Sequence, residues 1–166
     1  ASFLAVDVKE ITQYADTVNA CLSKGLCAPV GSIFAGSADV VKRARKWRKL
    51  LGGGMRQTGI LAAPALLALQ EMPRRLPEDH ANAAYLAEQL SEIDAVSVLT
   101  ERRDINMVFF RIDRDTALLK QLPRLLAADK ILINGQEANG EWRWVTHKDI
   151  DRSDIDRAVR KLSELV

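Results

Sequence analysis

A nearly unbroken apolar stretch over residues 57–69 constrains the fold more than any other part of this sequence. It predicts a helix whose apolar residues are Ile60, Leu61, Ala62, Ala63, Ala65, Leu66 and Leu67. A helix that is apolar all round is buried on most of its sides. We therefore expect this helix to need more protein around it than a small surface layer, and we expect Pro64 to kink it or to remove a hydrogen bond.

The length and composition predict a soluble globular chain of one domain or two small ones. The chain has 166 residues, of which 48% are hydrophobic and 28% are charged. It contains no run of about 18 apolar residues, so we expect no membrane-spanning segment. The N-terminus has no basic stretch of the kind that begins a secretion signal, and it lacks an initiator Met. We therefore expect a cytoplasmic protein, and a processed or truncated chain.

The sequence excludes several common kinds of site. Two cysteines and two distant histidines give no zinc-ligand spacing, so Cys21 and Cys27 are interpreted as reduced thiols and no metal is expected. Motifs for a nucleophile elbow, a phosphate-binding GxxxxGK loop, GxGxxG and HExxH are all missing from the sequence. The net charge of only +2 argues against binding of nucleic acid by overall charge.

The hydrophobic periodicity and the prolines of the sequence divide the chain near residues 72–77, and we expect domains at 1–73 and 74–166. In the first part we expect a helix from an N-cap at Ser37 to about Leu51, ended by three glycines. The other elements expected there are a helix over 6–15 and strands over 17–22 and 30–35. In the second part we expect helices on one face of a sheet. Its expected helices are 79–90, 116–128 and 153–166, and its expected strands are 96–99, 105–112, 130–134 and 142–146.

Lys24 is the first candidate for chemistry, because it follows a small apolar strand and precedes Gly25. A partly desolvated lysine has a lowered pKa. Its amine can then form an imine with an aldehyde. Small neighbours would leave space for a flat cofactor. From spacing alone, a surface lysine in a turn is by far the commoner interpretation, and the residues by themselves leave the cofactor lysine as the rarer alternative.

The expected helix after Ser37 is strongly basic, and three interpretations of it compete. Its cations lie within residues 42–49, with no acid among them: Lys42, Arg43, Arg45, Lys46, Arg48 and Lys49. The run could be a solvated helix face or a patch for nucleic acid or acidic membranes. It could also form an anion site, in which Lys49, the amides of residues 52–54 and Arg56 converge on a phosphate or carboxylate.

Arg143 is the third candidate, because it lies between Trp142 and Trp144 on an expected strand. Alternation places both tryptophans on one face of the strand and Arg143 on the other. A buried arginine requires an anion partner. That partner could be a structural carboxylate or the carboxylate of a substrate. His147 and Asp149 share the strand phase and could form a hydrogen bond.

Four ordered segments resemble the threonine aldolases, a family of enzymes that use pyridoxal 5'-phosphate (PLP). CLSKGLCAPVGS at 21–32 is similar to the family's cofactor-lysine segment, and RKWRKLLGGGMRQ at 45–57 resembles its next signature. EDHANA at 78–83 also fits the family. RWVTHKDI at 143–150 resembles the carboxylate-binding strand. The resemblance extends over nearly the whole chain.

The resemblance implies an α/β fold of the PLP-dependent transferase type, as in aspartate aminotransferase (fold type I). The chain would supply the end of the large cofactor domain plus a small α+β C-terminal domain. The implied reaction is cleavage of L-threonine or L-allo-threonine to glycine and acetaldehyde. By resemblance Lys24 is the Schiff-base lysine, Lys49 and Arg56 serve a cofactor phosphate of a neighbouring subunit, and Arg143 binds the substrate carboxylate. We expect a homodimer or homotetramer, with neither nucleic acid nor membrane as partner.

Two departures from the family qualify these expectations. In the family the phosphate-binding turn, the ring that stacks on the cofactor and the acid that pairs with its pyridine nitrogen all precede the lysine. Only 23 residues precede Lys24 here, so we expect a fragment or one piece of a nicked enzyme, inactive without the N-terminal half of the same enzyme. Cys27 stands where the family usually has glycine. Two alternatives remain: β-elimination from another amino acid, and a non-catalytic assembly fragment that uses the basic helix 42–49.

Overall fold

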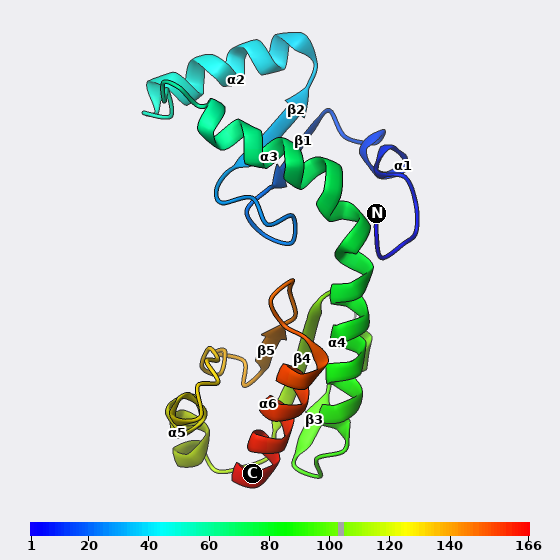
Figure 1. Cartoon of the computed structure of the whole chain (residues 1–166), viewed down its shortest axis with the longest axis vertical. Coiled ribbons are helices and arrows are strands. Elements are labelled where there is room, and N and C mark those ends of the chain that lie inside the picture. The colour runs from blue at the N-terminus through cyan, green and yellow to red at the C-terminus, as the bar shows by residue number, and fades with distance from the viewer. Residues whose placement is uncertain (103–104) are drawn as a thin grey trace. The chain divides into compact units, whose positions relative to one another are not determined.

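The computed structural model describes residues 1–102 and 105–166, which form two compact units, Ala1–Leu76 and Pro77–Val166 (Figure 1). The boundary expected after residue 73 lies within the 3-10 helix η1 (Met72–Arg75), near the end of the first unit. The assignment of these units to the domains of a larger enzyme stays a prediction. Within the described ranges, no helix is long and apolar enough to cross a membrane.

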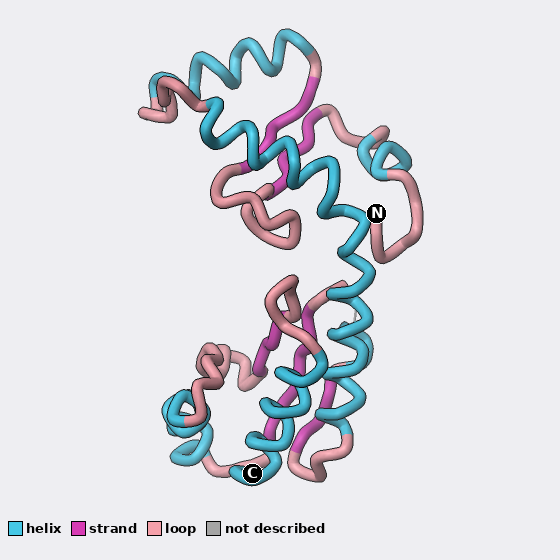
Figure 2. Tube along the Cα trace, viewed as in Figure 1, coloured by secondary structure: helices cyan, strands magenta, loops and turns pink. Residues whose placement is uncertain are grey.

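The first unit combines a two-stranded antiparallel sheet with three α-helices. Strands β1 (Thr17–Cys21) and β2 (Ser32–Gly36) form this sheet (Figure 2). Thr17 lies opposite Gly36, and Cys21 lies opposite Ser32. The first helix is shorter than the expected 6–15 at both ends, and a capping box of Asp7 and Glu10 fixes its start at Val8. The elements before η1 are α1 (Val8–Thr12), β1 (Thr17–Cys21), β2 (Ser32–Gly36), α2 (Ala38–Leu50) and α3 (Gly59–Glu71).

Helix α2 begins as its sequence predicts. The side chain of Ser37 accepts a hydrogen bond from the backbone N–H of Val40, as an N-cap does. Asp39 lies in the first turn, and Arg48 and Lys49 in the last turn, where each charge is favoured by the helix dipole. No residue of this helix is buried within the unit.

Helix α3 departs from the burial expected of it. Of its described residues only Ala68 is buried, while Ile60 is 73% exposed and Leu66 and Leu67 are each 56% exposed. One stripe of the helix, which includes Ala68, packs with Leu22 and Ala28 in a small core. The expectation of burial is therefore wrong within this unit, because the two short strands and their loops offer the helix only one surface to cover.

Within its described residues, the second unit is built on a three-stranded antiparallel sheet of β3 (Val96–Val98), β4 (Met107–Ile112) and β5 (Trp142–Val145), in that order. Its elements are α4 (Leu76–Ser91), β3 (Val96–Val98), the 3-10 helix η2 (Thr100–Arg102), β4 (Met107–Ile112), α5 (Thr116–Ala128), β5 (Trp142–Val145) and α6 (Arg152–Leu165). The bounds of α5 equal the expected 116–128. Asp115 caps this helix by accepting from the backbone N–H groups of Ala117 and Leu118.

The core of this unit lies on one face of the sheet. Along β4, Val108, Phe110 and Ile112 are buried, while the residues between them are not, as strand alternation requires. They pack with residues of α4, α5 and α6 in a single apolar cluster. The expected arrangement, with helices on one face of a sheet, is confirmed. The opposite face carries the charged residues of the candidate site.

The strand expected over 130–134 is absent from the structure. The first backbone N–H groups of this segment bond to the end of α5. The N–H of Lys130 donates to the carbonyl of Ala127, and the N–H of Ile131 donates to that of Leu126. This pair of bonds is the Schellman motif, and Lys130 adopts the left-handed conformation that the motif requires, with φ 61°. The helix end therefore competes successfully with sheet pairing at this point.

Candidate functional site

Lys24 lies on an ordered loop between β1 and β2. The buried residues Leu22 and Ala28 anchor this loop, and the N–H of Ala28 donates to the carbonyl of Leu22 at 2.9 Å. The carbonyl of Lys24 accepts from the N–H of Cys27 at 2.8 Å. The side chain of Lys24 is exposed, so the first unit does not supply the desolvation expected for it. It has no ion-pair partner among the described residues.

Two small-residue positions shape the lysine loop. A Cβ added to Gly25 would lie 3.1 Å from Cδ2 of Leu76, so glycine allows this close approach. Cys27 has a φ of 58°, in the left-handed region that favours glycine. This conformation gives a physical reason for glycine as the family's usual residue at the position that Cys27 holds.

The glycine run after α2 caps the helix instead of offering its amides to an anion. Gly52 N–H donates to the carbonyl of Lys49 at 3.2 Å, and Gly53 N–H donates to that of Arg48 at 2.8 Å. These two amides are therefore bonded within the chain, which argues against that part of the anion-site interpretation. The side chains of Lys49 and Arg56 are exposed and have no ion pair within the described part of the chain. No hydrogen bond or ion pair recorded there joins either of them to Lys24.

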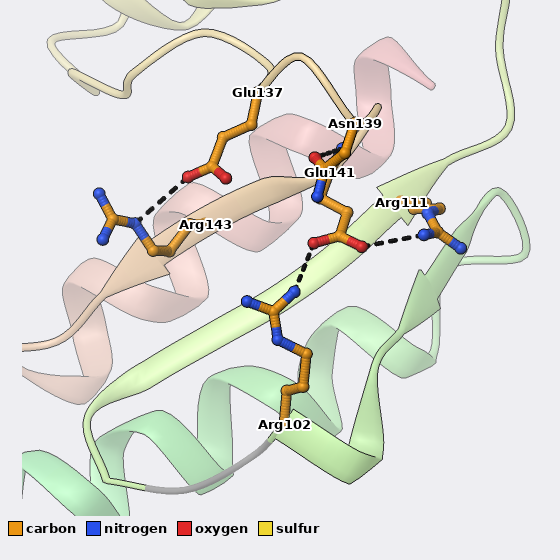
Figure 3. Close-up of polar contacts among 6 residues, drawn as sticks. All are labelled: Arg102, Arg111, Glu137, Asn139, Glu141 and Arg143. Atoms are coloured by element: carbon orange, nitrogen blue, oxygen red, sulfur yellow. Dashed lines mark hydrogen bonds and ion pairs between the residues drawn. The ribbon is translucent and has the colours of Figure 1, made fainter.

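Arg143 lies on the face of β5 opposite the core, as alternation predicts. Trp142 is 1% exposed and Trp144 is partly buried, whereas 43% of the Arg143 side chain is exposed. Nε of Arg143 lies 3.6 Å from Oε1 of Glu137 (Figure 3). Phe109 of β4 is the cross-strand partner of Arg143. Within the chain, the anion beside Arg143 is thus a structural carboxylate that leaves the arginine accessible.

A buried carboxylate joins two arginines next to this position. The side chain of Glu141 is only 7% exposed, and its oxygens accept from Nη1 of Arg102 and, at 2.9 Å, from Nη2 of Arg111 (Figure 3). Burial alone would raise the pKa of Glu141. Hydrogen bonding by Asn139 and Arg102, with the charges of both arginines, outweighs burial and lowers that pKa. The guanidinium of Arg102 also lies 3.7 Å from the centre of the Phe109 ring.

This cluster was not predicted from the sequence, although part of its signal is present there. Trp142 pairs with Phe110, so the next residues outward, Glu141 and Arg111, face each other across the strands. Opposite charges at facing positions attract. Alternation would have placed Glu141 and Arg143 on one face, but the register between two strands is not readable from either strand alone.

A cavity of about 420 Å³ lies beside the edge strand β5, within the second unit. Arg143 and Trp144 line it from β5, Ile131 and Ile133 from the segment after α5, and Ile155 from α6. The cavity combines apolar walls with a few polar groups, as small-molecule sites commonly do.

The other candidate groups form only a local contact. The backbone N–H of Asp149 donates to Nδ1 of His147 at 3.3 Å, so the expected hydrogen bond exists but uses the backbone of Asp149. In the described ranges no group of three or more His, Cys, Asp or Glu residues could hold a metal ion. Cys21 and Cys27 are both free thiols.

Comparison with known proteins gives one family match and several close relatives. The family model of beta-eliminating lyases matches residues 1–114, a range that includes Lys24, Lys49 and Arg56. The low specificity L-threonine aldolase of Escherichia coli K12 is 48% identical over 149 residues, covering 90% of this chain and 42% of the relative. The low-specificity L-threonine aldolase 1 of Arabidopsis thaliana is 40% identical over 154 residues, with 92% and 42% coverage. The chain thus spans less than half the length of these relatives.

Solved structures confirm the expected fold class. A protein of Exiguobacterium sp. 255-15, assigned as an aromatic amino acid beta-eliminating lyase/threonine aldolase, superposes with a TM-score of 0.80 at 20% identity, covering 99% of this chain and 49% of that one. A PLP-dependent aminotransferase of Streptococcus suis gives a TM-score of 0.70 at 20% identity, with 97% and 45% coverage. The fold is therefore part of the aminotransferase type of PLP enzyme. With the family match over residues 1–114, these likenesses show that the chain belongs to the beta-eliminating lyase family.

Proposed function

We propose that this chain is the C-terminal part of a PLP-dependent threonine aldolase, which cleaves L-threonine or L-allo-threonine to glycine and acetaldehyde. One observation carries the proposal: the chain is 48% identical, over 90% of its length, to a low specificity L-threonine aldolase. The substrate would be an amino acid with a hydroxyl group on its β-carbon, and the bond broken would join the α- and β-carbons.

The exposed amine of Lys24 fits the role of holding PLP. It is presented on a loop fixed by backbone hydrogen bonds, and no acid among the described residues competes for it. An amine in this state needs only desolvation to condense with an aldehyde. When bound, PLP supplies an electron sink for the electrons of the broken bond. Lys49 and Arg56 offer exposed cations that have no ion pair with any described residue, and such cations suit the phosphate of a neighbouring subunit's cofactor.

Arg143 would bind the α-carboxylate of the substrate. Its guanidinium is partly exposed on the sheet face away from the core, and a guanidinium binds a carboxylate bidentately. Such a clamp holds the substrate so that the bond to be broken keeps one orientation to the cofactor ring. The hydroxyl base is not assigned among the residues of this chain, and we propose that it lies in the N-terminal half.

The apolar surface of the first unit supports the N-terminal half of the same enzyme as a partner. Ile60, Leu66 and Leu67 of α3 remain largely exposed, and large exposed apolar patches are typical of interaction surfaces. Trp47 and Leu51, at the end of α2, are 62% and 82% exposed and suit a contact between subunits. We propose a cytoplasmic homodimer or homotetramer, with the two free thiols consistent with a reducing compartment.

The proposal is tested by labelling. The purified chain, with and without the N-terminal half, is mixed with PLP and reduced with borohydride, and peptide mapping then finds the modified residue. We expect modification of Lys24 only in the reassembled enzyme, and none after Lys24→Ala. Lys42→Ala, which removes an exposed lysine of α2, is the matched control and should keep the label. Labelling elsewhere would contradict the assignment of Lys24.

A product assay separates the two PLP reactions. An aldolase forms glycine and acetaldehyde from threonine, whereas a β-eliminating lyase acting on an amino acid such as serine or cysteine forms pyruvate and ammonia. We expect glycine and acetaldehyde from the reassembled enzyme. β-Elimination from threonine would instead give 2-oxobutyrate and ammonia. That outcome, or conversion of serine or cysteine to pyruvate without cleavage of threonine, would replace the aldolase by the β-elimination that the family name also allows.

A further inference from the structure

The guanidinium of Arg143 has a carboxylate on one edge and an open opposite edge. The 3.6 Å between its Nε and Oε1 of Glu137 is an ion pair without a tight hydrogen bond. Within the described part of the chain, no acceptor is recorded for its two terminal nitrogens. A guanidinium can clamp a carboxylate through both terminal nitrogens, or through Nε and one of them. Glu137 occupies the Nε edge and leaves the terminal edge to a ligand.

The position of Glu137 is fixed by the turn that it begins. Its N–H donates to the carbonyl of Glu141 at 2.8 Å, and its own carbonyl accepts from the N–H of Gly140 at 2.9 Å. The side chain of Gln136 closes the same turn by donating to the carbonyl of Gly140 at 2.8 Å. Three hydrogen bonds thus hold the backbone from which the Glu137 carboxylate extends.

The buried carboxylate of Glu141 anchors this loop to the rest of the sheet. That carboxylate is held by Arg102 at the end of η2 and by Arg111 of β4 (Figure 3). Because Glu141 immediately precedes β5, the same contacts fix the start of the strand that carries Arg143. Glu137 and Arg143 are therefore both placed relative to one anchor.

Three arginines and two acids pair on this side of the sheet. Arg102 and Arg111 already share the carboxylate of Glu141, so Glu137 is the acid recorded beside the third arginine in the described ranges. Arginine is a long side chain with many rotamers, and a ligand that needs one of them must restrict it on binding. An ion pair at Nε restricts the side chain beforehand without using the terminal nitrogens.

We propose that Glu137 is a positioning residue, which orients Arg143 so that its terminal nitrogens face the α-carboxylate of the amino-acid substrate. This inference rests on the proposed function of Arg143. It differs from the opposite possibility, in which Glu137 competes with the substrate for the guanidinium. The two predict opposite changes in substrate affinity when the charge of Glu137 is removed.

The test is Glu137→Gln in the reassembled enzyme. We expect KM for threonine to rise about two- to fivefold with kcat unchanged, the range that a partly exposed ion pair gives. A lowered KM would show competition, and an unchanged KM would show no role; either result overturns the inference. Glu164→Gln is the matched control, because it removes another partly exposed carboxylate from an ion pair, with Lys161 of α6, and should leave both constants unchanged.

Arg143→Lys distinguishes failure of the inference from failure of the proposed function. If Arg143 binds the carboxylate, this variant raises KM strongly, and adding Glu137→Gln to it has no further effect, since lysine has no Nε edge to orient. If Arg143→Lys leaves KM unchanged, the proposed substrate site itself fails. A raised KM in Arg143→Lys with an unchanged KM in Glu137→Gln overturns the positioning role alone.

A second readout uses the 166-residue chain without any cofactor. The Nε–H of Arg143 is followed by NMR, and its signal is identified by its loss in Arg143→Lys. We expect Glu137→Gln to shift this signal and to speed its exchange with solvent, and Glu164→Gln to leave it unchanged. An unaltered signal in Glu137→Gln would overturn the inference, because the proposed orientation acts through that N–H group.

Discussion

Replacing Leu162 with alanine tests whether α6 holds the second unit together. Leu162 is 0% exposed and belongs to the same apolar cluster as Phe110 and Trp142. The change removes three buried carbons, worth about 0.8 kcal/mol each and about 2.4 kcal/mol together. The cavity left behind adds about 1 kcal/mol or more. We therefore expect the free energy of unfolding of this unit to fall by about 3 to 4 kcal/mol.

Urea denaturation followed by tryptophan fluorescence measures this loss. Trp142 lies inside the affected cluster, and Trp47→Phe removes the signal from the first unit without touching the second. Leu132→Ala is the control, because Leu132 is 85% exposed and its loss should change the unfolding free energy by less than about 0.5 kcal/mol. A loss for Leu162→Ala of under about 1 kcal/mol, or one no larger than that of the control, would refute the reasoning.

Two further predictions concern the loss of stability at acid pH and the replacement of two glycines by alanine. Glu141 has a lowered pKa in the folded chain, so its contribution to stability is complete above the ordinary glutamate pKa and is lost as the pH falls through the lowered value. We expect Glu141→Gln to reduce the loss of stability at acid pH, measured as the urea midpoint against pH. An unchanged acid dependence of the midpoint would contradict this prediction. Gly53→Ala should destabilise the first unit, because the added Cβ would lie 2.9 Å from Cγ of Arg48. Gly59→Ala should instead raise the unfolding free energy by up to about 1 kcal/mol, because an added Cβ there meets no atom within 4 Å. Equal effects of the two glycine variants in thermal unfolding would count against the reasoning.

Local signals predicted much of the fold because they act within a few residues. Ser37 and Asp115 accept bonds from N–H groups two or three residues along, so helix starts could be read from the chain. Trp142 and Arg143 alternate because the strand geometry requires it. The aminotransferase-type fold was inferred from motifs of a known family, and the solved structures confirm it.

Interactions between distant segments were not predictable in the same way. The apolar run over 131–133 is typical of a strand, but a strand needs a distant partner, and the described residues offer this segment none. The carbonyls at the end of α5 capture the N–H groups of Lys130 and Ile131 instead. The pairing of Glu141 with Arg102 and Arg111 depends on strand register and on a 3-10 turn, neither of which composition reveals. The exposure of α3 depends on which protein segments pack against it, and the apolar pattern of the helix does not identify those segments.

The short strands at both edges of the second unit's sheet limit the surface on which a fibril could form. Within the described residues β3 has three residues and β5 has four, so either margin offers another chain few backbone groups on which to template a further strand. Arg143 adds a charge on β5, and identical charges stacked in register repel each other. The arginine proposed to receive a substrate thus also keeps copies of this sheet from stacking edge to edge.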